Sequence, residues 1–234
     1  MFRSLLARAG SAVAALPGRC MVCAAWPARP LCDPCAGRFA APVPRCQRCA
    51  LPLAGGATTC GACLRDPPPL DRCLAAVDYG FPWAQCIADF KFHGRPGMAR
   101  PLALLMRSTP WAEPEIDTAD ILVPMPQSLH RLRARGFNQA ALLARSLARR
   151  RTDDTLLLRL HDGAVQHTLG RRARFEAMRD AFAVEPLHVA RLAGRRVLLV
   201  DDVMTTGASL HAAARVLRQA GAVRVAALVL ARTA

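Results

Sequence analysis

Two consecutive carboxylates, Asp201 and Asp202, follow an apolar run and precede a hydroxyl-rich turn and the start of a helix-like segment. Backbone N–H groups at the start of a helix bind phosphate, and we predict that those of residues 205–209 do so, helped by their hydroxyls. Carboxylates repel phosphate, so we assign the pair to ribose hydroxyls or to Mg²⁺ through water, at a solvent-facing strand end. The predicted binding loop is Asp201, Asp202, Val203, Met204, Thr205, Thr206, Gly207, Ala208 and Ser209.

Three other interpretations of this loop fit the sequence less well. A receiver domain begins with similar residues but needs about a hundred more, and 234 − 202 leaves 32 after Asp202. A Walker loop requires a lysine after its glycine, where this chain has Ala208. A purely structural turn does not need two aspartates at the edge where parallel sheets bind ligands. The pattern therefore favours a site for a phosphorylated sugar.

Cationic residues that suit a diphosphate lie elsewhere in the chain. Arg131, Arg133 and Arg135 form an arginine-bearing loop between an apolar run and a helix-like segment, and guanidinium groups bind phosphate oxygens in pairs. A solvated basic surface explains Arg131 and Arg133 nearly as well, so Arg135, beside Gly136, is the strongest candidate. Lys91 is the only lysine among 32 basic residues, which suggests either a compact point charge at the site or a helix-terminal cation. We predict catalytic roles for Asp201, Asp202, Arg135 and Lys91, and ligand binding also for Arg133.

Eight cysteines form four CxxC pairs that are separated by eight to ten residues. Two thiolates on one tight turn can bind the same ion, and two such turns complete the tetrahedral site that Zn²⁺ prefers. We predict two structural zinc ions, while iron remains an alternative and disulfides would need an oxidising compartment. Sequential pairing of the turns is the simplest arrangement, and an interleaved one is also open. The predicted ligands are Cys20, Cys23, Cys32, Cys35, Cys46, Cys49, Cys60 and Cys63.

The composition of the 234 residues favours an anionic partner. The formal charge is +15, and residues 129–174 contribute eleven arginines against three aspartates, a net +8. Such a surplus favours nucleotides, nucleic acid or acidic membrane surfaces. No apolar run is long enough for a membrane span. The first sixteen residues have some features of a targeting peptide, but we expect a short amphipathic helix and a cytoplasmic protein.

Apolar runs alternate with helix-length segments from about residue 73, which predicts an α/β fold with a parallel sheet. The predicted buried parallel strands are 121–124, 155–160, 196–200 and 223–230, and the predicted helices are 137–150 and 208–221. We predict a short helix over 1–18, a double zinc ribbon over 19–66, a proline-rich linker over 67–72 and an α/β domain over 73–234. Cys73 and Cys86, outside the paired cysteines, are predicted core residues.

Together these motifs resemble a known family. Residues 197–210 are similar to the phosphoribosyl pyrophosphate (PRPP) signature of type I phosphoribosyltransferases. With residues 123–144 and the CxxC pairs, the chain resembles the ComF family of competence-associated proteins, in which a double zinc ribbon precedes a phosphoribosyltransferase domain. Residues 166–182 resemble a further family stretch, although Ala177 stands where that family has asparagine.

The resemblance implies binding of PRPP with Mg²⁺, or of a related nucleotide, and a role in DNA uptake that includes single-stranded DNA and other competence proteins. An active transferase that moves ribose 5-phosphate from PRPP to a base or amine is the alternative function. In the first case the pocket serves binding, and in the second the cations stabilise charge on departing pyrophosphate.

Overall fold

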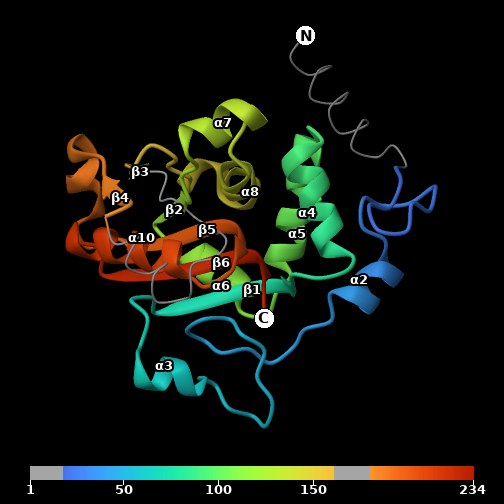
Figure 1. Ribbon diagram of the computed structural model, residues 1–234, viewed down its shortest axis with the longest axis horizontal. Helices are drawn as coiled ribbons and strands as arrows, with labels where there is room; N and C mark the ends of the chain where they lie inside the picture. Colours follow the sequence, from blue (N-terminus) through green and yellow to red (C-terminus); the bar gives the residue numbers. More distant parts are fainter. Residues whose placement is uncertain (1–17, 161–179) are drawn as a thin grey trace, which may run out of the picture. The chain divides into compact units, whose positions relative to one another are not determined.

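The computed structural model describes residues 18–160 and 180–234 (Figure 1). Its contacts divide the chain into two compact units, Met1–Ala41 and Pro42–Ala234. In the described part of the first unit, a β-bridge joins Gly18 to Ala28, and α2 (Asp33–Phe39) follows. Residues 1–17, and residues 161–179 with most of the motif at 166–182, lie outside the described ranges.

The second unit contains a four-stranded sheet whose strands are all parallel and follow the order β1-β6-β5-β2. Its strands are β1 (Arg72–Asp78), β2 (Ile121–Pro124), β5 (Arg196–Met204) and β6 (Arg224–Arg232). Successive residues of a strand point to opposite faces, and nearly all residues of β6 are buried, so both faces of the sheet are covered. The predicted α/β fold with a parallel sheet is confirmed.

Helices of the second unit cover this sheet. Helices α5 and α8 pack against each other and contact the sheet, whereas α10 shares a core cluster with alternate residues of β5 and β6. The α-helices are α3 (Gly61–Arg65), α4 (Trp83–Phe92), α5 (Ala99–Arg107), α6 (Ala112–Thr118), α7 (Leu129–Arg135), α8 (Gln139–Ala148) and α10 (Ala208–Gln219). Short 3-10 turns are η1 (Pro96–Met98), η2 (Arg149–Arg151) and η3 (Pro186–Leu192).

One predicted strand was assigned to the wrong sheet. Residues 155–160 contain β3 (Leu157–Arg159), which pairs antiparallel with β4 (Phe182–Val184) in a separate two-stranded sheet. The chain makes a single parallel bridge to β2 at Thr152 and then turns away, because the Asp153 carboxylate accepts hydrogen bonds from the N–H and hydroxyl of Thr155. The apolar run therefore packs beside the main sheet instead of extending it.

The second cysteine cluster is part of the core of the second unit. Cys46, Cys49 and Cys63 belong to the same hydrophobic cluster as the α10 side of the sheet, and Leu70, in the predicted linker, is fully buried. The predicted partition into independently folding domains, with all eight paired cysteines in one ribbon domain, stays a prediction. Among the described residues, no helix is long and apolar enough to cross a membrane.

Candidate functional site

The loop after β5 has the shape that the sequence predicted for a phosphate site. Strand β5 runs to Met204, and α10 begins at Ala208, so residues 205–207 form a short turn before a twelve-residue helix. Gly207 has a φ of +84°, which favours glycine, and a Cβ atom there would have to displace Met204 Cε, 2.5 Å away. Residues 201 and 203–210 line a small open pocket at this turn. The N-terminus of α10 thus faces a space suited to a small anion.

The acidic pair lies inside β5, and its position differs from the expected solvent-facing strand end. Asp202 is buried, with an exposed fraction of 7%, and Asp201 is half-buried. The Asp201 carboxylate accepts a 2.9 Å hydrogen bond from the N–H of Asp202. Burial and then the charge of Asp202 raise the pKa of Asp201 to about 7. The Asp201 carboxyl therefore holds its proton to near neutral pH.

Lys91 approaches Asp202 from a different element. Its Nζ lies 2.9 Å from Asp202 Oδ1, and the Lys91 side chain is mostly buried in the last turn of α4. An ammonium group in the last turn also lies favourably in the field of the helix. Both sequence interpretations of Lys91, a point charge at the site and a helix-terminal cation, describe its position.

Arg135 completes the charged group at this edge. It lies in the last turn of α7, its guanidinium carbon stands 4.8 Å from the centre of the Phe92 ring, and it donates a 3.3 Å hydrogen bond to Gln139 Oε1. Burial lowers the pKa of Arg135, and the nearby charge of Asp202 opposes that shift. The structure thus pairs Lys91 directly with Asp202 and places Arg135 within range of the charge of Asp202.

The predicted arginine loop is a helix. Residues 129–135 form α7 because the Ser128 hydroxyl accepts a hydrogen bond from the N–H of Arg131 at the start, and Gly136, with a φ of +78°, ends it. Arg131 and Arg133 are exposed on this helix. Arg133 is therefore less closely tied to the acidic pair than Arg135 is.

Two residues near the site were not identified from the sequence. Phe92 is 65% exposed and stacks on Arg135, and the positive charge of Arg159 on β3 lowers the pKa of Asp201. A lone arginine within the apolar run 155–160 was the available signal for Arg159. Phe92 follows Lys91, but a single aromatic residue at a helix end carries no specific signal.

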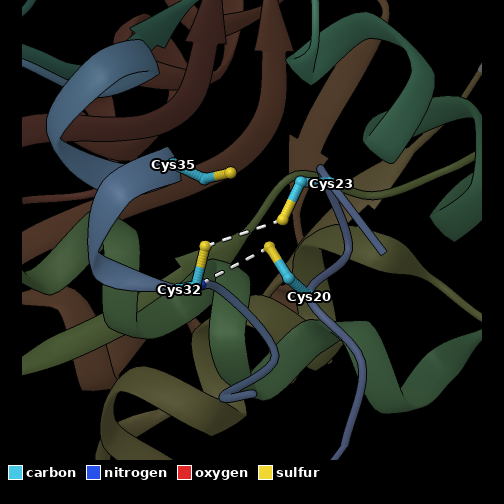
Figure 2. Close-up of side chains that lie close together, drawn as sticks. All are labelled: Cys20, Cys23, Cys32 and Cys35. Atoms are coloured by element: carbon cyan, nitrogen blue, oxygen red, sulfur yellow. Dashed lines mark hydrogen bonds between the residues drawn. The ribbon is translucent and has the colours of Figure 1, made fainter. Parts of the chain in front are cut away.

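The eight paired cysteines form two groups in sequential order, Cys20, Cys23, Cys32 and Cys35, then Cys46, Cys49, Cys60 and Cys63. Within each group the sulfur atoms lie within 4.8 Å of one another. Figure 2 shows the four side chains of the first group pointing toward one another. The Sγ atoms are 3.8 Å apart between Cys23 and Cys32 and 3.7 Å apart between Cys49 and Cys60. Four sulfurs about 2.3 Å from a central Zn²⁺ lie about 3.8 Å apart, whereas a disulfide is about 2.05 Å long. Each group therefore could hold a tetrahedral metal ion.

Backbone N–H groups support one sulfur in each group. The N–H of Cys32 donates to Cys20 Sγ at 3.5 Å, and the N–H of Cys60 donates to Cys46 Sγ at 3.3 Å. Such hydrogen bonds favour the thiolate, which is the form that binds metal. Cys73 and Cys86 are buried in the core, as predicted.

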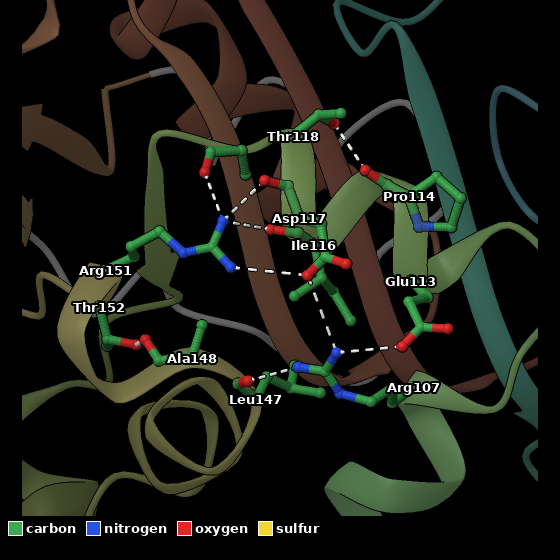
Figure 3. A network of polar contacts seen from close by, with 11 residues as sticks. Arg107, Glu113, Pro114, Ile116, Asp117, Thr118, Leu147, Ala148, Arg151 and Thr152 are labelled. Carbon is green, nitrogen blue, oxygen red and sulfur yellow. Dashed lines mark hydrogen bonds and ion pairs between the residues drawn. The ribbon is translucent and has the colours of Figure 1, made fainter.

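Part of the basic segment at 129–174 has a structural role. Arg151 Nη1 donates hydrogen bonds to the carbonyl oxygens of Ile116, Asp117 and Ala119 at 2.7, 3.0 and 2.8 Å (Figure 3). Arg107 contributes to the same network with a 2.7 Å bond to the Leu147 carbonyl. The Arg151 bonds satisfy carbonyl groups around the end of α6, and the Arg107 bond satisfies one in the last turn of α8. Arg151 therefore differs from Arg149 and Arg150, which are exposed.

Comparison with known proteins identifies relatives along most of the chain. A model of the phosphoribosyl transferase domain matches residues 134–234. The chain is 33% identical over 230 residues to "DNA utilization protein YhgH" of Salmonella typhimurium, covering 93% of this chain and 98% of the relative. It is 30% identical over 209 residues to "Competence protein F" of Haemophilus influenzae, covering 86% and 90%. It is also 30% identical over 158 residues to "Competence protein ComFC" of Bacillus subtilis, covering 68% and 62%.

Proposed function

The chain belongs to the ComF family, and from this premise we propose that its second unit binds PRPP with Mg²⁺ and that the protein handles single-stranded DNA during DNA uptake. The ion pair between Lys91 and Asp202, on the strand that leads into the loop after β5, carries the proposal, and Arg135 lies within range of the charge of Asp202. The proposed site would combine the carboxyl groups of Asp201 and Asp202 for the sugar with cations for a diphosphate. It would lie next to a helix N-terminus that suits a phosphate.

Each part of PRPP has a matching part of the site. The N-terminus of α10, with the hydroxyls of Thr205, Thr206 and Ser209, would hold the 5′-phosphate. Asp201 and Asp202 would bind ribose hydroxyls, or Mg²⁺ through water, and the ion would offset charge on the diphosphate. Arg135, with Lys91 beside it, would contact the diphosphate, and the exposed Arg133 would join at longer range.

The names of the relatives support the DNA role, because two of them are called competence proteins and another a DNA utilization protein. The charge surplus of residues 129–174 supports it as well. Arg131 and Arg133 on α7 and Arg149 and Arg150 after α8 are exposed, so their guanidinium groups can meet a phosphate backbone. Other competence proteins are the expected partners in this process.

Transfer of ribose 5-phosphate to a base or amine is the second candidate function, and the raised pKa of Asp201 favours it. A carboxylate with a pKa of about 7 suits a general base at neutral pH. In this reaction an acceptor nitrogen would form a bond to the ribose carbon while the bond between that carbon and pyrophosphate breaks. Asp201 would take the proton from the nitrogen. Lys91 and Arg135 would stabilise the negative charge of the departing pyrophosphate.

We infer that the metal in both cysteine groups is zinc, because four thiolates in a closed tetrahedron are its preferred structural site. Thiolates that bind metal persist in a reducing compartment, which supports a cytoplasmic location.

Calorimetric titration with PRPP, in the presence and absence of Mg²⁺, tests the proposal. We expect Mg²⁺-dependent binding that the double variant Asp201→Asn with Asp202→Asn abolishes, and a thermal melt of the variant checks its fold, because Asp202 is buried beside Lys91. Equal PRPP binding by parent and double variant would refute the ribose assignment. Incubation of the PRPP complex with a panel of bases and amines separates the two functions, because pyrophosphate release occurs only in the transferase.

A further inference from the structure

The last residue of β6, Arg232, joins the second cysteine group to the phosphate loop. Its side chain is buried, with an exposed fraction of 5%. The guanidinium Nε donates a 2.9 Å hydrogen bond to the Cys49 carbonyl oxygen, and Nη1 donates to the carbonyl oxygens of Met204, at 3.3 Å, and Thr205. One cation thus binds the backbone of a metal-ligand turn on one side and the first residues of the loop on the other.

A second set of contacts also connects the second cysteine group to the phosphate loop. The N–H of Cys73 on β1 donates a 2.8 Å hydrogen bond to the carbonyl of Gln47, which lies inside the Cys46–Cys49 turn. The Cys73 Sγ lies 3.5 Å from Met204 Sδ, and Met204 Cε fills the space beside Gly207. The Met204 side chain, which lies beside Gly207, is therefore packed against β1, and the Cys46–Cys49 turn is hydrogen-bonded to that strand.

We propose that Arg232 is a positioning residue through which metal binding by the second cysteine group sets the geometry of the phosphate loop. The inference rests on the proposed binding of PRPP at that loop. Without an ion, the Cys46–Cys49 turn loses the ligand bonds that fix its backbone. The Cys49 carbonyl then no longer anchors the guanidinium, and the carbonyls of Met204 and Thr205 lose a shared, fixed donor.

The charges act in the same direction. Four thiolates with one Zn²⁺ carry a formal charge of about −2, which stabilises a buried guanidinium nearby. When the ion is lost, the Cys49 carbonyl no longer holds Arg232 in a fixed position, and the loop loses its rigid support. Only the second group belongs to the unit that contains the loop, so the first group provides a matched control.

The experiment compares Cys60→Ser in the second group with Cys32→Ser in the first, together with Arg232→Gln and Arg232→Lys. For each, bound zinc, amide hydrogen exchange at residues 203–209 without ligand, and PRPP affinity are measured. We expect Cys60→Ser and Arg232→Gln to speed exchange in the loop and to weaken PRPP binding by about tenfold or more. Arg232→Lys should have a smaller effect, and Cys32→Ser should leave the loop and the affinity unchanged.

Unchanged loop exchange in Cys60→Ser after loss of one zinc ion would overturn the inference. If Cys60→Ser fails to fold, Arg232→Gln decides, because it keeps every cysteine: faster exchange with both zinc ions bound supports the linkage, and parental exchange refutes it. If the parent does not bind PRPP, the proposed function fails, whereas loop exchange still decides whether the cysteine group positions the loop.

Discussion

Lys91 Nζ lies 2.9 Å from Asp202 Oδ1 and joins the end of α4 to the carboxyl half of β5. Both side chains are largely buried, so each stabilises the charge of the other. We expect Lys91→Met to leave a buried carboxylate without its cation and to weaken PRPP binding by about 10- to 100-fold, as for a lost charged hydrogen bond. Arg95→Met is the control, since Arg95 is exposed and lies 3.6 Å from Asp89. Calorimetry that shows equal losses in both variants would contradict a specific role for Lys91.

The raised pKa of Asp201 gives a pH dependence with a definite sign. The folded protein holds this proton up to about pH 7, whereas the unfolded carboxyl loses it near pH 4, so the stabilising contribution present below about pH 4 is lost as pH rises towards 7. Asp201→Asn should therefore raise the unfolding temperature more at pH 8 than at pH 5. PRPP binding by the parent should strengthen as pH rises through 7, because the ionised carboxylate binds Mg²⁺ or hydroxyls best.

Asp120→Asn is the counterpart for this measurement. Hydrogen bonds from Arg196 lower the pKa of Asp120 to about 2, so its contribution is present at neutral pH and is lost as pH falls from about 4 through 2. We expect this variant to be less stable than the parent at pH 7 and to converge with it in acid. Parallel pH profiles for the parent, Asp120→Asn and Asp201→Asn would show that neither carboxyl is perturbed.

Metal content should be about two zinc ions per chain. Cys46→Ser and Cys23→Ser should each reduce it to about one, because the two residues belong to different groups of four. Elemental analysis of purified protein makes the measurement, and iron in place of zinc would change the assignment of the ion. Absence of metal, combined with paired disulfides by mass spectrometry, would refute the metal sites.

Variants of Arg151 and of its neighbours Arg149 and Arg150 should separate an effect on stability from an effect on DNA binding. Arg151→Gln removes three hydrogen bonds to carbonyl groups around the end of α6 and should lower the free energy of unfolding by about 2–4 kcal/mol, with little effect on DNA. Arg149→Gln with Arg150→Gln should keep stability. That double variant should reduce the magnitude of the slope of log affinity for single-stranded DNA against log salt by about 1.4. This figure corresponds to two lost phosphate contacts at about 0.7 each. An unchanged slope in the Arg149→Gln, Arg150→Gln variant would place the DNA surface elsewhere.

The loop itself offers a graded test. Thr206→Val removes one hydroxyl but leaves the backbone N–H groups, so PRPP binding should weaken by about 1–3 kcal/mol. Gly207→Ala requires an unfavourable φ of +84° and a shift of Met204 Cε, which lies 2.5 Å from the new Cβ, so binding should weaken. Thermal melts of both variants show whether the sheet persists. Normal affinity in Gly207→Ala would mean that this turn does not hold the phosphate.

Local sequence patterns were sufficient for the strand, turn and helix around the loop after β5 and for the fold class. They favoured the sequential cysteine groups but left an interleaved pairing open. In the loop, the polar residues lie within a few residues of one another, so spacing determines geometry. The positions of Arg159 and Phe92 depend on contacts between distant segments, which spacing does not contain. Strand β1, which the sequence analysis did not identify, has alternating half-buried and buried residues at a sheet edge, and α7 depends on the cap at Ser128. The burial of Asp202 likewise depends on its ion pair with Lys91, which lies more than a hundred residues away in the sequence.

The strand order β1-β6-β5-β2 also has a consequence for the timing of folding during synthesis. The two earliest strands of the main sheet, β1 and β2, are the outer ones, and within it their partners are β6 and β5, which are its last two strands made. A nascent chain that has passed β2 therefore carries two apolar strands without their partners, until more than seventy further residues have been added. Pairing over such separations is slow and leaves strand edges open to aggregation. We expect ribosome-bound intermediates of this chain to depend on chaperones until β6 has emerged.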